Sequence, residues 1–224
     1  MLTVRDLTKV FSHAGEPHVI FENLSFDVAP GERMALLGRN GQGKSTLIKI
    51  LGGVVFPTSG RVSWGNMTSS WPLGFGGGFQ GSLTGLDNVR FISRVYNRPG
   101  DEILEKAEAF AELGDAIEMP MKYYSSGMRA RLAFGISLAI EFDCYLIDEI
   151  IAVGDAAFRQ KCQEELFGKR AHRTFIIASH DLNFLKSACS RAIVIESGRA
   201  KVFDDVDVAV EVYDAIFHRT AAVG

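Results

Sequence analysis

The stretch GRNGQGKST, residues 38–46, decides the fold of this 224-residue chain. Gly38 and Gly43 let the backbone wrap closely around phosphate oxygens, while successive N–H groups and the start of a following helix supply positive potential. We expect Lys44 to reach the terminal phosphates of a nucleotide and Ser45 to offer its hydroxyl to Mg²⁺. The predicted nucleotide- and metal-binding residues of this loop are Gly38, Asn40, Gly41, Gly43, Lys44, Ser45 and Thr46.

The sequence on either side of this loop favours the same interpretation. ERMALLG (32–38) is a short apolar run typical of a buried parallel strand, and KSTLIKILGG (44–53) contains helix-forming residues that end at two glycines. A strand, a Gly-rich loop and a helix form the context that a phosphate-binding P-loop requires. The chain is therefore predicted to be an α/β protein of the P-loop NTPase type.

An acidic motif follows a second apolar run. CYLIDE (144–149) places two carboxylates at the carboxyl end of a predicted strand, where ligands of α/β proteins collect. We expect Asp148 to hold hydrated Mg²⁺ and Glu149 to polarise a water molecule for attack on the γ-phosphate. Taken alone, the pattern is equally typical of a strand that meets solvent, so the prediction depends on the neighbouring motifs.

A histidine lies just past a third apolar run, TFIIAS (174–179), which is predicted to be another strand. This position puts His180 on the nucleotide edge, where we expect it to sense the γ-phosphate. A lone histidine is more often a surface or core residue than a catalytic one. The prediction for His180 therefore also depends on the other motifs.

These motifs, together with YSSGMRAR (124–131), resemble the ATP-binding cassette (ABC) superfamily over nearly the whole chain. The commonest form of the family's signature is Leu-Ser-Gly-Gly-Gln, and this chain keeps the serine and the second glycine as Ser125 and Gly127. The resemblance implies an ATPase that uses ATP and Mg²⁺ and works as a head-to-tail homodimer. Ser125 and Gly127 would then act on ATP bound to the other copy, with Asp155 at the dimer seam.

The resemblance implies a single nucleotide-binding domain over 1–224, with an antiparallel β subdomain and an inserted α-helical subdomain. Alternation predicts strands of a small antiparallel sheet over 2–11 and 18–28, with a further strand over 61–65, and helical periodicity runs from about 86 to 140. The elements expected after the Asp-Glu motif are a helix over 155–169, strands over 174–179 and 191–197 and a C-terminal helix over 206–217.

Two further residues of the family pattern each have an alternative explanation. Phe11 stands where the family stacks an aromatic ring on adenine, although a core phenylalanine of a small sheet is nearly as good an explanation. Gln80 stands closer to the segment 82–89 than the family's spacing for a Mg²⁺-contacting glutamine allows, so it either binds Mg²⁺ or merely occupies the loop.

The surrounding segment, WPLGFGGGFQG (71–81), does not fit a dinucleotide fold, because no strand-glycine-helix unit with a downstream acid surrounds it. We expect a hinge beside the surface that grips a membrane partner, since glycines permit large changes of φ and ψ. A passive loop is the alternative explanation.

The departures from the family pattern indicate a branch. YSSGMRARLAF (124–134) and AVGDAAF (152–158) resemble the ATPases of polysaccharide exporters, which handle capsular polysaccharide, O-antigen or teichoic acid. The chain stops at Gly224, without room for the carbohydrate-binding C-terminal domain of some O-antigen exporters, and this favours capsule. The implied partners are an integral-membrane permease that handles the polysaccharide and a second copy of the chain, at the cytoplasmic face of the inner membrane.

Composition limits the other function classes. A net charge of −3 gives no basic footprint for nucleic acid, so a soluble cassette acting on DNA or ribosomes is the less favoured alternative. The chain also lacks a coiled-coil insertion between the P-loop and the signature, which argues against that alternative.

No apolar run approaches the roughly 18–20 residues of a membrane span, and the N-terminus does not resemble a signal peptide. Three scattered cysteines without a C-x-x-C pair indicate reduced thiols.

Overall fold

The computed structural model describes residues 1–13, 16–73, 78–148 and 155–221. The chain forms two compact units, each described by itself below. Unit 1 comprises Met1–Pro72, Asp143–Glu149 and His172–Gly224, and unit 2 comprises Leu73–Phe142 and Ile150–Ala171. The domain prediction, a single domain with a helical subdomain of about 86–140, stays a prediction.

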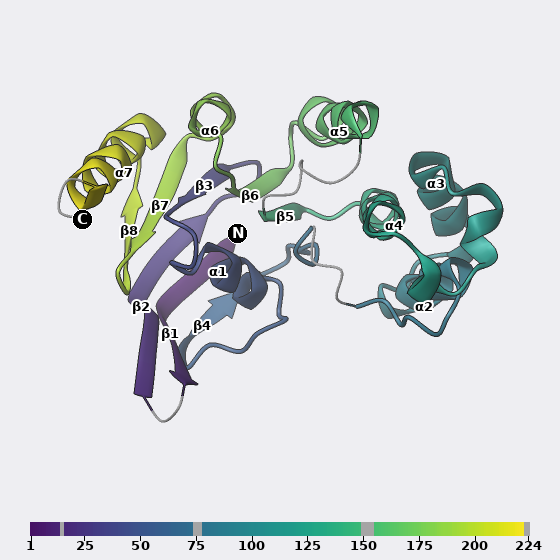
Figure 1. Ribbon diagram of the computed structural model, residues 1–224, viewed down its shortest axis with the longest axis horizontal. Coiled ribbons are helices and arrows are strands. Elements are labelled where there is room, and N and C mark those ends of the chain that lie inside the picture. The colour runs from purple at the N-terminus through teal and green to yellow at the C-terminus, as the bar shows by residue number, and fades with distance from the viewer. Residues whose placement is uncertain (14–15, 74–77, 149–154, 222–224) are drawn as a thin grey trace. The chain divides into compact units, whose positions relative to one another are not determined.

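A three-stranded antiparallel sheet forms one part of unit 1, in the order β2-β1-β4 (Figure 1). Its strands are β1 (Leu2–His13), β2 (Glu16–Val28) and β4 (Ser59–Ser63). Alternate side chains such as Leu2, Val4, Phe26 and Val28 are buried, because successive residues of a strand point to opposite faces. The antiparallel subdomain predicted from this alternation is confirmed.

A five-stranded sheet forms the other part of unit 1, in the order β5-β6-β3-β7-β8. Its strands are β3 (Arg33–Leu37), β5 (Cys144–Asp148), β6 (Thr174–Ala178), β7 (Arg191–Glu196) and β8 (Arg199–Phe203). The first four strands of that order are parallel and β8 is antiparallel to β7. Their nearly continuous apolar runs are buried, as expected for parallel strands covered on both faces.

Helices cover both faces of this sheet. Figure 1 shows α1 (Lys44–Leu51) on one face and α6 (Leu182–Ala188) with α7 (Val206–Ala221) on the other. Leu47, Ile48 and Leu51 of α1 are buried, and burial of each such side chain contributes about 1.5–3 kcal/mol. The helix ends at Gly52, as its sequence predicted.

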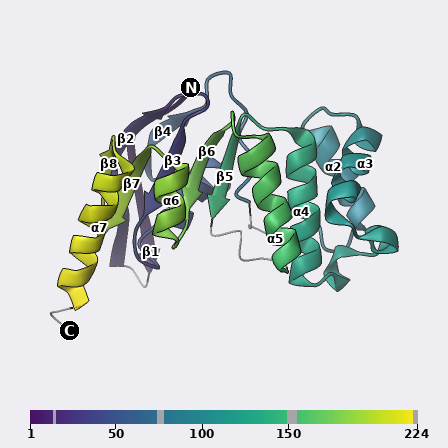
Figure 2. The ribbon, with the colours of Figure 1, turned by 90° about the horizontal axis from the view of Figure 1, so that it is seen from above.

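Unit 2 is helical (Figure 2). Its helices are α2 (Gly85–Val95), α3 (Gly100–Ala111), α4 (Ser126–Ile140) and α5 (Ala156–Gln163), and α5 continues as a π-helical stretch, Glu164–Lys169. Two short 3₁₀ helices, Gly114–Glu118 and Met121–Tyr123, connect α3 to α4. These helices fall where helical periodicity was predicted, including the helix expected after the Asp-Glu motif.

Two properties of the described residues bear on function. No helix among them is long and apolar enough to cross a bilayer. Cys144, Cys162 and Cys189 are buried free thiols, and burial raises the pKa of Cys162 and Cys189 to about 12. Such raised pKa values make Cys162 and Cys189 poor nucleophiles.

Candidate functional site

The P-loop of unit 1 connects β3 to α1 and is pressed against neighbouring strands. A Cβ on Gly38 would collide with the carbonyl oxygen of Ile195 in β7, and a Cβ on Gly43 would collide with the Cγ2 of Ile20 in β2. Gly43, the N-cap of α1, also has a φ of 113°, which side-chain-bearing residues rarely adopt. Glycine is therefore required at both positions.

Lys44 is folded back over this loop. Its side chain is buried, and its Nζ donates hydrogen bonds to the carbonyl oxygens of Gly38 at 2.6 Å and Arg39 at 3.2 Å. A buried ammonium is stabilised only when such acceptors satisfy it. The positive charge is thus held at the centre of the loop, as its predicted role requires.

Ser45 and Asp148 meet at the start of α1. The Oγ of Ser45 donates a hydrogen bond to the Oδ1 of Asp148 over 2.9 Å. Mg²⁺ in nucleotide sites is held by one or two protein oxygens together with phosphates and water, so this pair fits the ion. Within the described ranges no cluster of three or more His, Cys, Asp or Glu could hold a metal.

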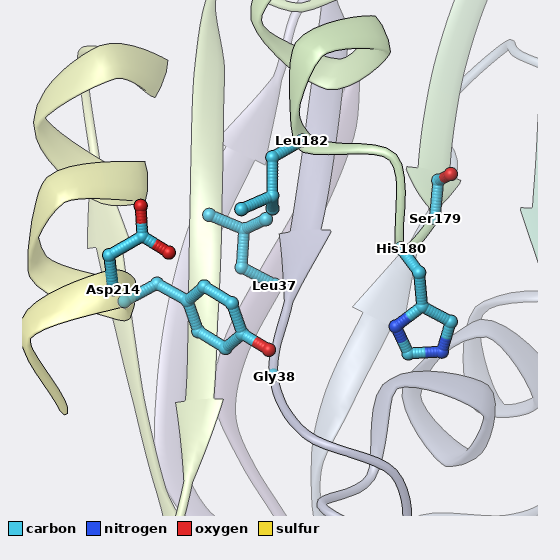
Figure 3. A pocket seen from close by; sticks show the side chains of 7 residues that line it. Leu37, Gly38, Ser179, His180, Leu182 and Asp214 are labelled. Carbon is cyan, nitrogen blue, oxygen red and sulfur yellow. The ribbon is translucent and has the colours of Figure 1, made fainter. Parts of the chain in front are cut away.

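His180 lies at the same edge of the sheet. Ala178 of β6 is paired with Leu36 of β3 and with Asp148 of β5, so the strands end at one level. Figure 3 shows His180 beside Ser179 past the end of β6, and Gly38 past the end of β3, around a cavity of about 210 Å³. The predicted residues Gly38, Asp148 and His180 are thus gathered at the carboxyl ends of neighbouring parallel strands.

Phe11 lies in β1 opposite His18 of β2. Its ring is 42% exposed and lies 4.5 Å from the Nζ of Lys9, so Phe11 is not a core residue. This excludes the core explanation for Phe11, while its contact with adenine stays a prediction.

His18 also lines a cavity of about 250 Å³ between β2, the P-loop residues Gly41 and Gln42, and the β7–β8 turn. The Oε1 of Gln42 accepts a hydrogen bond from the backbone N–H of Ser197 at 2.8 Å. The sequence did not reveal His18, Gln42 or Ser197 as site residues, because only the fold brings their three segments together.

In unit 2, Ser125 is the N-cap of α4. Its exposed Oγ accepts a hydrogen bond from the N–H of Met128 at 3.1 Å, which leaves the hydroxyl proton able to point outward. The preceding residue, Tyr124, is buried, and its hydroxyl donates to the carbonyl oxygen of Ala116 at 2.6 Å. Ser125 and Gly127 therefore lie at the N-terminus of a helix that is anchored immediately upstream.

Gln80 is held by α2. Its backbone N–H donates to the Oδ1 of Asn88 at 2.8 Å, and the Nδ2 of Asn88 donates to the carbonyl oxygens of Gln80 and Thr84. Asn88 is fully buried. The Gln80 side chain donates to the Oγ of Ser82 at 3.2 Å. Its predicted contact with Mg²⁺ stays a prediction, and residues 74–77 of the predicted hinge lie outside the described residues.

Asp155 is the N-cap of α5. Its Oδ1 accepts a hydrogen bond from the N–H of Phe158 and its Oδ2 accepts one from Arg131, both at 2.8 Å. The Phe158 N–H, and then the Arg131 charge, hold the pKa of the carboxyl below its ordinary value. The position of Asp155 at a dimer seam stays a prediction. Glu149, the predicted base, lies outside the described residues.

The sequence matches a family of known proteins. Residues 21–152 match the family model described as ABC transporter. The chain is 48% identical over 214 residues to the ATP-binding protein BexA of Haemophilus influenzae, covering 96% of this chain and 98% of BexA. It is 48% identical over 216 residues to the capsule polysaccharide export ATP-binding protein CtrD of Neisseria meningitidis serogroup B, covering 96% of this chain and all of CtrD.

The fold matches solved structures as well. The dimeric structure of a post-hydrolysis state of the ATP-binding cassette MJ0796, bound to ADP and Pi, aligns with a TM-score of 0.74 at 20% identity. The alignment covers 91% of this chain and 98% of that one, which confirms the predicted fold class. The matched motifs, the fold and the sequence identities agree, and the chain belongs to the ABC transporter family.

Proposed function

We propose that this chain is the ATP-hydrolysing subunit of a transporter that exports capsular polysaccharide across the inner membrane. The observation that carries the chemistry is the meeting of Ser45 and Asp148 beside the P-loop, at 2.9 Å. The cargo is supported by the names of relatives such as CtrD, a capsule polysaccharide export protein that is 48% identical to this chain.

In the proposed reaction, backbone N–H groups of the P-loop bind the phosphates of ATP. The ammonium of Lys44 exchanges its carbonyl partners for oxygens of the terminal phosphates. Ser45 and Asp148 hold Mg²⁺, with Gln80 as the third predicted contact; the ion, when bound, neutralises charge on the phosphate oxygens. Glu149 accepts a proton from the attacking water, and His180 contacts the γ-phosphate.

Adenosine is proposed to lie along the outer side of the P-loop. Phe11 offers an exposed ring for stacking, and the cavity beside its cross-strand neighbour His18 reaches Gly41 and Gln42. An aromatic face and a polar cavity next to a phosphate loop suit a base and a ribose.

Hydrolysis is proposed to take place in a head-to-tail homodimer. The hydroxyl of Ser125 accepts a hydrogen bond from the N–H of Met128 and can itself donate a hydrogen bond to the γ-phosphate bound by the other copy. Gly127 in the same turn adds the positive end of α4. ATP then bridges the two copies, with Asp155 at the seam, and its hydrolysis releases them.

The membrane partner is proposed to be an integral permease, to which two copies of the chain bind at the cytoplasmic face. The O-antigen export protein RfbB of Klebsiella pneumoniae is 37% identical to this chain over 204 residues, and TagH, a teichoic acids export protein of Bacillus anthracis, is 35% identical over 207 residues. These identities are lower than 48%, so O-antigen or teichoic acid export is the second candidate.

Co-purification tests the proposal. The tagged chain is isolated from detergent-solubilised membranes, and the accompanying integral subunit is identified by mass spectrometry. A strain that lacks the chain is expected to lose its surface polysaccharide, and the Lys44→Ala variant is expected not to restore it. Recovery with ribosomes or nucleic acid alone, or a deletion strain with normal surface polysaccharide, contradicts export.

A further inference from the structure

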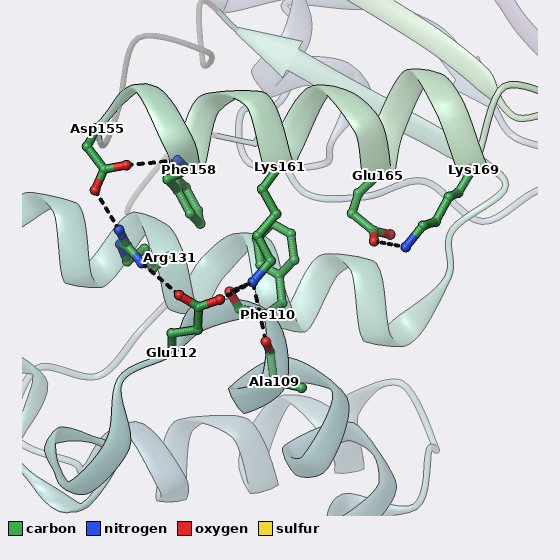
Figure 4. A network of polar contacts seen from close by, with 9 residues as sticks. All are labelled: Ala109, Phe110, Glu112, Arg131, Asp155, Phe158, Lys161, Glu165 and Lys169. Atoms are coloured by element: carbon green, nitrogen blue, oxygen red, sulfur yellow. Dashed lines mark hydrogen bonds and ion pairs between the residues drawn. The ribbon is translucent and has the colours of Figure 1, made fainter.

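A charged cluster joins three helices of unit 2 (Figure 4). At its centre is Arg131 of α4, which donates a hydrogen bond to the Oδ2 of Asp155 at 2.8 Å. On the other side, a guanidinium nitrogen of Arg131 lies 3.8 Å from an oxygen of Glu112, at the end of α3. The guanidinium also lies over the ring of Phe158, 4.7 Å from its centroid. Arg131 is therefore oriented mainly by Asp155 and the ring of Phe158, and Glu112 is a longer contact.

The two ends of the central pair belong to segments that have proposed roles in ATP hydrolysis. Arg131 belongs to the same helix as the signature residues Ser125 and Gly127. Asp155 begins α5, and its second carboxylate oxygen accepts from the N–H of Phe158 in the first turn of that helix. One carboxylate thus connects the first turn of α5 to the signature helix.

Hydrogen bonds and ring contacts connect the three helices at the base of the cluster. Lys161 of α5 donates to Glu112 and to the carbonyl oxygen of Phe110 at the end of α3. Beneath these charges the ring of Phe158 packs edge to face against Phe110, at 5.4 Å, and against Phe134 of α4, at 6.1 Å. Aromatic contacts of this kind fix the relative positions of the helices that carry them.

The exposure of the central pair decides between a stabilising and a positioning role. The side chain of Asp155 is 61% exposed and that of Arg131 22% exposed. Ion pairs with so much solvent contact contribute little to the free energy of unfolding. The hydrogen bond to Asp155 and the contact with the Phe158 ring instead constrain the direction of the planar guanidinium, which is the property that positioning needs.

We propose that Arg131 is a positioning residue for ATP hydrolysis, which holds Asp155 and the first turn of α5 in a fixed orientation relative to Ser125 and Gly127. The proposal rests on the proposed function. When the ATP of the other copy binds at the start of α4, Asp155 follows that helix because Arg131 links them. The described partners of Arg131 all lie within unit 2, and the P-loop lies in unit 1, so Arg131 is expected to govern the catalytic rate and not the affinity of the P-loop for ATP.

A double-mutant cycle tests the link in the full chain, purified with its membrane subunit. Arg131→Gln removes the charge, and Asp155→Asn removes the ion pair while keeping a good N-cap. Each single variant is expected to lower kcat on the order of 10-fold, with the KM for ATP within about 2-fold of wild type. The double variant is expected to be no slower than either single variant, because both changes break one link.

Two further variants sharpen the result. Glu112→Gln is the matched control, since it removes the other carboxylate beside Arg131 and leaves the bond to Asp155; its kcat is expected to stay close to wild type. Arg131→Lys keeps the charge but lacks the planar set of N–H donors of the guanidinium, so its kcat is expected to lie between those of Arg131→Gln and wild type. Thermal unfolding of every variant shows whether it folds. If Arg131→Gln does not fold, the kcat values of the single variants Asp155→Asn and Arg131→Lys still test the proposal.

Several outcomes overturn the proposal. The first is a wild-type kcat in Arg131→Gln or Asp155→Asn, and the second is additive losses of kcat in the double variant. The others are a loss of kcat in Glu112→Gln as large as in Arg131→Gln, or a raised KM for ATP with an unchanged kcat in Arg131→Gln. A Lys44→Ala complex with wild-type ATPase activity would instead overturn the proposed function. A Lys44→Ala complex without activity, beside a fully active Arg131→Gln complex, overturns only the positioning role.

Discussion

The hydroxyl of Ser45 donates a 2.9 Å hydrogen bond to the carboxylate of Asp148, across 103 positions of sequence. Ser45 lies in the first turn of α1, and Asp148 ends β5, which is separated from the P-loop strand β3 by β6. The sheet therefore brings the hydroxyl and the carboxylate together. A pair of hard oxygen groups in this position is what a phosphate-bound Mg²⁺ needs.

Removing either member of this pair is expected to change the Mg²⁺ dependence of ATP hydrolysis. Ser45→Ala should raise the Mg²⁺ concentration for half-maximal ATPase activity, and Asp148→Asn should lower kcat by roughly 100-fold or more, because the ion's charge is no longer held in place. Titrations of Mg²⁺ at fixed ATP measure both effects. Wild-type Mg²⁺ dependence in Asp148→Asn would contradict the assignment.

Asp143 predicts a pH-dependent contribution to stability. Its Oδ2 accepts from the N–H of Thr68 at 2.8 Å and from the hydroxyl of Thr68, and its Oδ1 accepts from Arg173. The Thr68 N–H is the main cause that lowers the pKa of this carboxyl. A lowered pKa means that the stabilisation is complete above the unfolded-state pKa, about 3.9, and is lost as the pH falls through the folded-state pKa.

Asp143→Asn is therefore expected to lower the free energy of unfolding by roughly 1 kcal/mol at pH 7, a value reduced for the partial exposure of the side chain. The difference from wild type should shrink below about pH 4. Urea unfolding of both proteins between pH 7 and about pH 3.5 measures it. A difference that stays constant over this range would show that the carboxylate charge is not the cause.

Gly85 at the start of α2 is expected to be irreplaceable. A Cβ there would collide with the hydroxyl oxygen of Tyr124, and would lie only 3.0 Å from Ile117. Gly85→Ala should lower the free energy of unfolding by about 1–3 kcal/mol, as overpacking does. Adding Tyr124→Phe should recover part of this loss, because it removes the clashing oxygen.

Gly100→Ala is the matched control for that prediction. Gly100 begins α3, and a Cβ there would meet only the Cγ of Arg90, at 4.0 Å. The substitution should be neutral or slightly stabilising, because alanine reduces the entropy of the unfolded chain. Equal stabilities of Gly85→Ala and Gly100→Ala in thermal or urea unfolding would contradict the close contact at Gly85.

Periodicity predicted most of the fold, and its failures have physical reasons. β8 was not predicted from the sequence, although Ser197 and Gly198 have φ values of 49° and 77°, typical of a two-residue hairpin turn. The Ser-Gly pair was the available signal for this turn. α6 was not predicted either; its N-cap Asp181 accepts a hydrogen bond from the N–H of Phe184. A helix this short has too few turns to show a periodic pattern.

The candidate site, like the fold, could be predicted from the sequence only in part. The positions of the P-loop, Asp148 and His180 at one edge of the sheet could be predicted, because each lies at the carboxyl end of a strand whose apolar run is visible in the sequence. The bond between Arg131 and Asp155, and the packing of Tyr124 against Gly85, could not. They join segments whose contact depends on how the helices pack, and no local pattern specifies the partner of a charged or aromatic side chain.

His180→Ala is expected to slow turnover while ATP-dependent dimerisation is retained, because His180 is proposed to contact the γ-phosphate at the hydrolytic step. Steady-state ATPase assays and size-exclusion chromatography with ATP separate the two effects. A variant with wild-type kcat would show that the histidine has another role at this edge of the sheet.

The most direct measurement compares wild type, Lys44→Ala and Glu149→Gln by ATPase assay and by size-exclusion chromatography with ATP and Mg²⁺. The wild-type chain with its membrane subunit should hydrolyse ATP. Lys44→Ala should lose both nucleotide affinity and dimerisation, whereas Glu149→Gln should bind ATP without hydrolysing it and elute as a stable dimer. Identical behaviour of the two variants, or undiminished hydrolysis in either, would contradict the account.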